Sequence, residues 1–349
     1  MSWIKKKLFS LSIILISCFI GLLIVEISLR ITNSGKKWLI ADEMNILRNF
    51  QFNYDISNLY LSDVLKVNYV RNEFGLRDNC DGPDKIDILT IGGSSTDQRY
   101  VNFEFTYQTI LQQRLRAVTN DFGCVSNAGI DGHSTKGHLF AFENWFPLIP
   151  KLKPKFILLY VGLNDVQFMI NKENNIKSFL KRFYTVRKLL PIYHFLRQSS
   201  DENLMLRHVP LDYKLNDYTV KEINRETVGL SIENEKAFKS RMTILLEKIR
   251  DLNATPICVT QPHRYVIKKN DNMMYGIPNV VGVGFSGIDY DYALRQLNSI
   301  LFELCGENTV DLYSHNFLKI HFYDGAHTTD LGSQEIGNKL ADFIISRFY

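Results

Sequence analysis

Three side chains in this sequence could together break an ester bond: those of a serine, a histidine and an aspartate. Ser94 lies in the stretch Gly-Gly-Ser-Ser-Thr (92–96), directly after an apolar segment, and Asp324 precedes His327 by three residues. A serine hydroxyl is a poor nucleophile unless an imidazole takes its proton, and a carboxylate must hold that imidazole in the right tautomer. Asp-x-x-His in one tight turn could supply both groups. Taken singly, each stretch is also typical of an ordinary capped turn.

Two further stretches offer hydrogen-bond donors for the negative oxygen that forms when a hydroxyl attacks a carbonyl. Gly132, at the end of Asn-Ala-Gly-Ile-Asp-Gly, could offer its backbone N–H, and Asn164, in Val-Gly-Leu-Asn-Asp, its side-chain amide. A helix starting just after Ser94 would add backbone amides beside the same oxygen. Because glycine, asparagine and aspartate are also common in turns, the order of the four stretches along the chain is more informative than any one of them.

The elements that would position these residues alternate between strands and helices. Apolar runs predict strands over 85–93, 124–130, 155–162, 256–261 and 309–313. Helical spacing predicts helices over about 103–118, 135–148, 233–252 and 290–304, with a last one from residue 329 or 330. This alternation predicts an α/β fold, a three-layer sandwich whose mainly parallel five-stranded sheet has helices on both faces. Ligands of such sheets meet the loops at the carboxyl ends of the strands, where we expect the four stretches to lie.

With these four ordered stretches, the chain resembles the SGNH/GDSL hydrolase family over about residues 86–349. The resemblance implies an SGNH, flavodoxin-like fold in which Ser94 attacks an ester carbonyl, His327 acts as base and then as acid, and Asp324 orients His327. It also implies an oxyanion hole made by the N–H groups of Ser94 and Gly132 and by the Asn164 side chain. The chain departs from the family pattern at Gly93, where the family usually has aspartate. That aspartate is not the attacking group, so the chemistry should survive the change, but loop rigidity and substrate preference could differ.

The N-terminus predicts a membrane anchor. After Lys5, Lys6 and Lys7, Leu8–Val25 is a run of eighteen residues without a charge, which at about 1.5 Å per residue nearly crosses the hydrocarbon layer. No small-residue cleavage pattern follows, so we predict an uncleaved signal anchor, a single transmembrane helix with the rest of the chain extracytoplasmic. Leu-Ile-Ser-Cys (15–18) loosely resembles a lipoprotein processing site, which leaves lipidation as the alternative. The predicted organisation is an anchor over 1–30, a connecting segment over 31–85 and a hydrolase domain over 86–349 with an insertion at about 166–232.

Charge and cysteine content narrow the classes of partner. The net charge is +4 and the basic residues are dispersed, so nucleic acid is not expected as a partner. The five cysteines show no metal-binding spacing, and we expect neither a metal nor a cofactor. Cys80 and Cys124 each precede a predicted strand, so a disulfide between them is one hypothesis and buried thiols are the alternative.

Other polar residues near predicted strand ends could contact a substrate. His133 follows Gly132, and His263 and Arg264 follow the strand over 256–261. Each could line the pocket, although exposed or packed side chains with no role in binding are the simpler interpretation.

Three functions remain open from the sequence. The first is a membrane-anchored serine esterase that hydrolyses small acyl esters, such as O-acetyl groups on a glycan. The second is an O-acyltransferase that uses the same triad to modify a cell-surface polysaccharide, since a sugar hydroxyl can intercept an acyl-enzyme as well as water can. The third, prompted by Gly93, is a catalytically silent glycan-binding module on the same fold.

Overall fold

A computed structural model describes residues 3–33, 44, 46–119, 122–170, 219–220, 230–268, 274–280 and 285–349. The described residues of Met44–Asn171 and Leu206–Tyr349 form one compact unit, and Met1–Glu43 with Lys172–Met205 form another. The site lies in the first of these, and each unit is described by itself.

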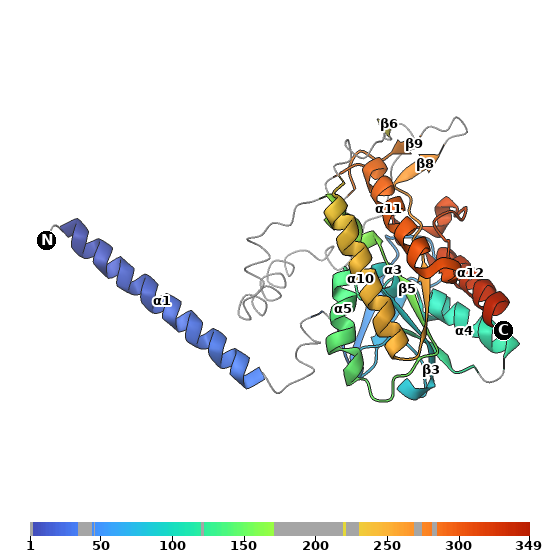
Figure 1. Cartoon of the computed structure of the whole chain (residues 1–349), viewed down its shortest axis with the longest axis horizontal. Helices are drawn as coiled ribbons and strands as arrows, with labels where there is room; N and C mark the ends of the chain where they lie inside the picture. The colour runs from blue at the N-terminus through green and yellow to red at the C-terminus, as the bar shows by residue number, and fades with distance from the viewer. Residues whose placement is uncertain are drawn as a thin grey trace. The chain divides into compact units, whose positions relative to one another are not determined.

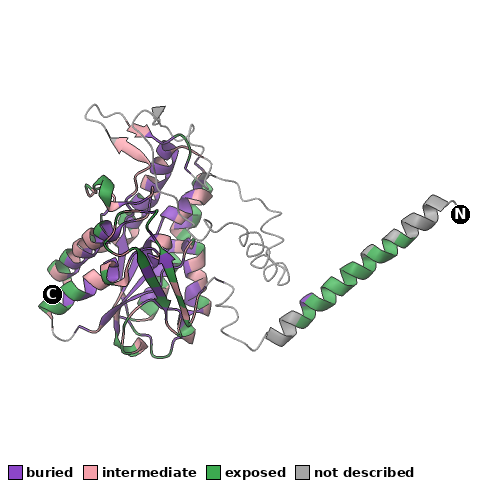
Figure 2. Cartoon of the chain, turned by 180° about the vertical axis from the view of Figure 1, so that it is seen from behind, coloured by how far each residue is buried: buried purple, intermediate pink, exposed green. Residues whose placement is uncertain are grey.

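The centre of the larger unit is a five-stranded parallel sheet with the strand order β10-β7-β5-β3-β4, as the alternation of elements predicts. The strands are β3 (Ile86–Gly92), β4 (Cys124–Asn127), β5 (Phe156–Tyr160), β7 (Thr255–Val259) and β10 (Thr309–Val310). Nearly every residue of β3, β4, β5 and β7 is buried, as expected for strands covered on both faces. Figure 2 shows buried residues concentrated in the sheet and on the sides of the helices that face it.

Helices cover both faces of this sheet (Figure 1). On one side α4 (Tyr107–Val118) packs against α12 (Asp330–Phe348), and their apolar faces join the sheet in one core cluster. On the other side α10 (Ile232–Asp251) packs against both α5 (Thr135–Asn144) and α11 (Gly287–Cys305). Two short helices, α3 (Ser94–Asp97) and α6 (Val166–Ile170), begin at or just beyond the ends of β3 and β5. The three-layer arrangement predicted from the sequence is therefore present.

Residues 50–71, within the segment expected to be a connection, fold into an antiparallel ribbon of β1 (Phe50–Asp55) and β2 (Lys66–Arg71). Its apolar residues form a second core cluster that also includes Tyr323. The Arg71 side chain is only 3% exposed, and its guanidinium lies 2.5 Å from a carboxylate oxygen of Asp97, the last residue of α3. Tyr60, in the loop of the ribbon, stacks on Tyr323 with ring centroids 5.5 Å apart. The ribbon is thus built into the body of the protein.

The predicted insertion at about 166–232 lies mostly outside the described residues. The described parts are α6, the two-residue strand β6 (Thr219–Val220) and the start of α10. β6 pairs with β9 (Met274–Gly276), which also pairs with β8 (Val266–Lys268), in a small antiparallel sheet.

Two disulfide bonds lie in the part of the chain that the structure describes. Cys80 is bonded to Cys124, with Cα atoms 5.8 Å apart, so the pairing hypothesised from the sequence is confirmed. Cys258 is bonded to Cys305, which the sequence analysis did not foresee because nothing in the local pattern places the end of α11 beside β7.

The N-terminal helix α1 runs over Trp3–Asn33 and includes the uncharged run. Across the ranges that the structure describes, none of the helices meets the combined length and hydropathy required to cross a membrane. The membrane anchor and the extracytoplasmic position of the body stay predictions.

Candidate active site

Ser94 stands at the point where β3 leaves the sheet. The strand ends at Gly92 and α3 begins at Ser94, so the chain turns sharply over two glycines. A Cβ atom at Gly92 would clash with the Thr96 side chain and with the carbonyl oxygen of Tyr160. The glycine is therefore required by close packing, and it lets the serine sit at the edge of the sheet.

The Ser94 hydroxyl meets the imidazole of His327, 233 positions later in the chain. Ser94 Oγ lies 2.7 Å from His327 Nε2, and His327 Nδ1 lies 2.6 Å from Asp324 Oδ2. The other oxygen of Asp324 accepts backbone N–H bonds from Ala326 at 2.8 Å and from His327 at 2.7 Å. The carboxylate is thus held by the same tight turn that carries the histidine, and the three side chains have the geometry of a nucleophile, a base and an orienting acid.

The surroundings of His327 favour its protonated form. Burial acts to lower the pKa of His327, but the charge of Asp324 and its hydrogen bond to the ring act more strongly in the other direction. The pKa of His327 therefore lies above its ordinary value of 6.5. The ring of Tyr323 stacks on the imidazole, with centroids 5.7 Å apart and 13° between the planes, and fixes the orientation of the ring.

This raised pKa predicts the pH dependence of ester turnover. His327 must be neutral to accept the Ser94 proton, so kcat/KM should rise with pH through the pKa of His327. The midpoint of this rise should lie above pH 6.5, because the pKa is raised from that value. The measurement is a pH profile of kcat/KM with an aryl acetate whose own hydrolysis is subtracted. A midpoint at or below 6.5 would contradict the assignment of His327 as base.

Asn164 lies in the same pocket as Ser94, on the short 3-10 turn Leu163–Asp165 that follows β5. Its Nδ2 donates one hydrogen to the backbone carbonyl of His133 at 2.9 Å, which holds the amide in place. The second hydrogen of the same nitrogen can then be donated to a ligand. The next residue, Asp165, is buried and accepts hydrogen bonds from the backbone N–H of Thr135 at 3.0 Å and from its hydroxyl at 2.5 Å. Asp165 thus anchors the turn, and Asn164 lines the pocket.

The position of Asn164 depends on Gly93. A Cβ atom at Gly93 would overlap Asn164 Nδ2, so any larger residue at this position would push the amide away. Gly93 stands where the family pattern that the sequence resembles usually has aspartate. In this chain a side chain at that position would meet the Asn164 amide.

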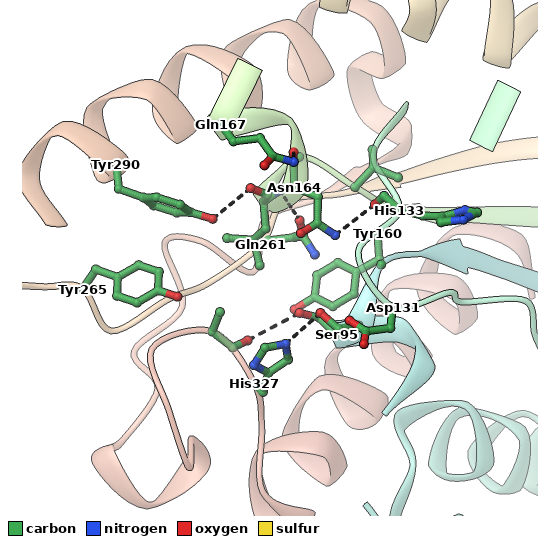
Figure 3. Close-up of a pocket in the computed structure, with 16 residues that line it drawn as sticks. Ser95, Asp131, His133, Tyr160, Asn164, Gln167, Gln261, Tyr265, Tyr290 and His327 are labelled. Carbon is green, nitrogen blue, oxygen red and sulfur yellow. Dashed lines mark hydrogen bonds between the residues drawn. The ribbon is translucent and has the colours of Figure 1, made fainter. Parts of the chain in front are cut away.

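Gly132 and His133 were also predicted as site residues. Gly132 has φ of +76°, a conformation that favours glycine, and lies between two pocket-lining residues, Asp131 and His133. The His133 ring is turned away from the pocket in Figure 3, and its Nε2 lies 3.1 Å from the carbonyl oxygen of Met44.

His263 and Arg264 lie outside the pocket that contains Ser94, contrary to the expectation from the sequence. Both line a separate cavity. The His263 ring is buried against Asp291 of α11, with 3.1 Å between Nε2 and Oδ1. From the same segment, Gln261 and Tyr265 line the pocket of Ser94 instead.

The pocket has a volume of about 270 Å³ and an aromatic and polar lining. Residues that line it and that the sequence analysis missed are Asp131, Tyr160, Gln167, Gln261, Tyr265 and Tyr290. Figure 3 shows several of them around His327. Two of them carried a signal: Gln261 is the last residue of the predicted strand over 256–261, and Asp131 lies in the stretch that ends at Gly132. Within the described ranges, no group of three or more His, Cys, Asp or Glu residues could hold a metal ion.

Comparison with known proteins finds likenesses among solved structures. The chain is similar to an acetyl xylan esterase at 14% identity, with a TM-score of 0.39, over 74% of this chain and 98% of that one. It is similar to the acetylxylan esterase Axe2 from Geobacillus stearothermophilus at 14% identity, with a TM-score of 0.40, over 74% and 93%. It is also similar to a G-D-S-L family protein from Desulfitobacterium hafniense DCB-2 at 14% identity, with a TM-score of 0.39, over 73% and 98%. No protein-family model and no curated protein matches the sequence. The function proposed below rests on the geometry of the site.

Proposed function

We propose that this protein is a serine esterase that cleaves small acyl esters with Ser94, His327 and Asp324. The observation that carries the proposal is the unbroken pair of contacts, 2.7 Å from Ser94 to His327 and 2.6 Å from His327 to Asp324, within one pocket. A lone capped turn would not bring a hydroxyl from residue 94 to an imidazole at residue 327.

The geometry supports a two-step reaction. Ser94 Oγ attacks the ester carbonyl while its proton passes to His327 Nε2, and the carbonyl oxygen becomes negative. The C–O bond to the alcohol then breaks, and the leaving alcohol takes the proton from His327. A water molecule, deprotonated by His327, attacks the acyl-serine, and the acid leaves as Ser94 recovers its proton. The side-chain amide of Asn164 is the donor that would stabilise the negative oxygen in both steps, together with the N–H groups of Ser94 and Gly132.

The size and lining of the pocket support a small acyl group on a polar alcohol. A volume of about 270 Å³ is near the lower end of the range for small-molecule sites. Its walls carry amide and phenol groups, which suit the hydroxyls of a sugar better than an alkyl chain. We therefore propose O-acetylated glycans as the substrate class.

The experiment that tests this function is an assay of residues 35–349 with aryl acetates and acetylated sugars, with free acetate measured. Release of acetate into water supports the esterase. If the acetyl group appears on an added oligosaccharide instead of in water, the protein is an O-acyltransferase. Absence of turnover for every ester, together with absence of labelling by an organophosphonate probe, would leave only a binding module.

The two disulfides support the predicted extracytoplasmic location, because such bonds persist in oxidising compartments. Thiol counting under denaturation on protein isolated from its native compartment, with and without reductant, tests this point. Recovery of all five cysteines as free thiols would count against it.

A further inference from the structure

One wall of the pocket carries hydrogen-bond donors that the triad and the oxyanion hole do not use. This wall is made by Gln261 and Tyr265, from the segment that follows β7. The Gln261 side chain is 2% exposed, so its polar groups face either protein or the pocket.

The orientation of the Gln261 amide is fixed by its neighbour Leu163. Gln261 Oε1 accepts the backbone N–H of Leu163 at 2.7 Å, and the carbonyl of Leu163 accepts the Tyr290 hydroxyl at 2.9 Å. Because Gln261 Oε1 is hydrogen-bonded to Leu163, the amide nitrogen Nε2 points away from Leu163. Among the residues that the structure describes, none accepts a hydrogen bond from that nitrogen, and Gln261 lines the pocket.

Tyr265 presents a second donor beside the catalytic turn. Its ring packs directly over Gly325, where a Cβ atom would clash with it, and it meets the ring of Tyr290 at 4.8 Å. The hydroxyl is directed into the pocket in Figure 3 and has no hydrogen-bond partner within the described ranges. Burial raises the pKa of this hydroxyl well above neutral pH, so it keeps its proton and can donate.

The position of Tyr265 indicates which half of an ester it would meet. The leaving alcohol must lie beside His327 Nε2 to receive its proton. Gly325, under the Tyr265 ring, is two residues from His327 in the same turn. Tyr265 therefore flanks the space for the alcohol half of the ester.

We propose that Gln261 and Tyr265 bind oxygen atoms of the alcohol half of the ester and so select hydroxyl-rich alcohols, such as sugars, over alkyl or aryl alcohols. This inference rests on the proposed esterase function. Buried donors need acceptors, and an alkyl chain at this wall would leave both groups without partners. A sugar offers hydroxyl and ring oxygens to the donors and an apolar face to the Tyr265 and Tyr290 rings.

The test compares two esters with the same acyl group, 6-O-acetylglucose, whose alcohol half keeps its other hydroxyls, and 4-nitrophenyl acetate. The Tyr265→Phe variant removes only the hydroxyl. The Gln261→Glu variant keeps an oxygen for the Leu163 N–H and removes the amide donor. For Tyr265→Phe we expect kcat/KM to fall about tenfold or more with the sugar ester and to change less than about threefold with the aryl ester. Gln261→Glu also adds a carboxylate that affects both esters, so for it we expect the ratio of the sugar value to the aryl value to fall about tenfold or more. Tyr292→Phe, a tyrosine on α11 that does not line the pocket, is the matched control and should leave both values unchanged.

The outcomes separate this inference from the function on which it rests. An equal loss for both esters would mean that the two residues act through the catalytic geometry, which would overturn the inference and leave the esterase standing. Unchanged values for both esters in both variants would also overturn it. If the native protein hydrolyses neither these esters nor any other and is not labelled by an organophosphonate probe, the proposed function itself fails.

Discussion

The Ser94→Ala variant is expected to lose turnover of aryl acetates by at least about 10⁴-fold and to lose covalent labelling by an organophosphonate probe. The Ser94 hydroxyl is the group that lies 2.7 Å from His327 Nε2, the atom that would accept its proton. Alanine removes the nucleophile without adding volume, so the fold should not change. The measurements are kcat/KM with 4-nitrophenyl acetate and the mass of the probe adduct.

The neighbouring hydroxyl provides the comparison for this variant. Ser95 Oγ donates to the carbonyl oxygen of Ala326, 3.4 Å away, whereas the two ring nitrogens of His327 meet Ser94 and Asp324. Ser95→Ala should therefore keep the labelling, and peptide mapping should place the adduct on Ser94. Labelling that persists in Ser94→Ala would refute the nucleophile assignment.

The second large effect is expected at Gly93. Replacement of Gly93 by aspartate, the residue that the SGNH/GDSL pattern usually has there, should lower kcat by about 10²–10³-fold, the typical cost of one lost oxyanion donor. The reason is steric, since a Cβ atom at this position would overlap Asn164 Nδ2. The Asn164 amide would have to leave the place where the carbonyl of His133 holds it.

A double-mutant cycle shows whether Gly93 acts through Asn164. Asn164→Ala alone should lower kcat by a similar factor, and adding Gly93→Asp to it should cost little more, because the clashing amide is gone. Thermal unfolding of each variant shows whether the loss comes from unfolding. If the two effects on kcat simply multiply, Gly93 has another role.

Much of the fold could be predicted because strands buried on both faces leave continuous apolar runs, and the helices between them leave a 3.6-residue spacing. The positions of β3, β5 and β7 were visible in this way. The ribbon of β1 and β2 was not, because its apolar residues meet partners such as Tyr323 that lie far away in the sequence. The same holds for the buried pair of Arg71 and Asp97, since a buried charge and an exposed one look alike in a sequence.

The meeting of Ser94, Asp324 and His327 could be predicted because each of them follows a strand or precedes a helix, and the topology of a parallel sheet brings such ends together. The pocket wall made by Gln261 and Tyr265 could not be predicted from the sequence. After β7 ends at Val259, the alternation of side chains between two faces no longer applies. The sequence therefore could not show that Gln261 and Tyr265 face the pocket while His263 packs against Asp291.

The ribbon contacts residues that lie next to Ser94 and next to His327. Arg71 reaches the short helix that Ser94 begins, and Tyr60 stacks on Tyr323, which stacks on His327. A fragment starting at β3 would keep Ser94, Asp324 and His327, but the buried Asp97 carboxylate would lose Arg71 and keep only its contact with Arg99 among these two cations. Removing one partner from a buried ion pair is destabilising. Shortening the chain from this side would therefore destabilise the surroundings of the site while Ser94, Asp324 and His327 are all still present, so the smallest stable piece has to include the ribbon.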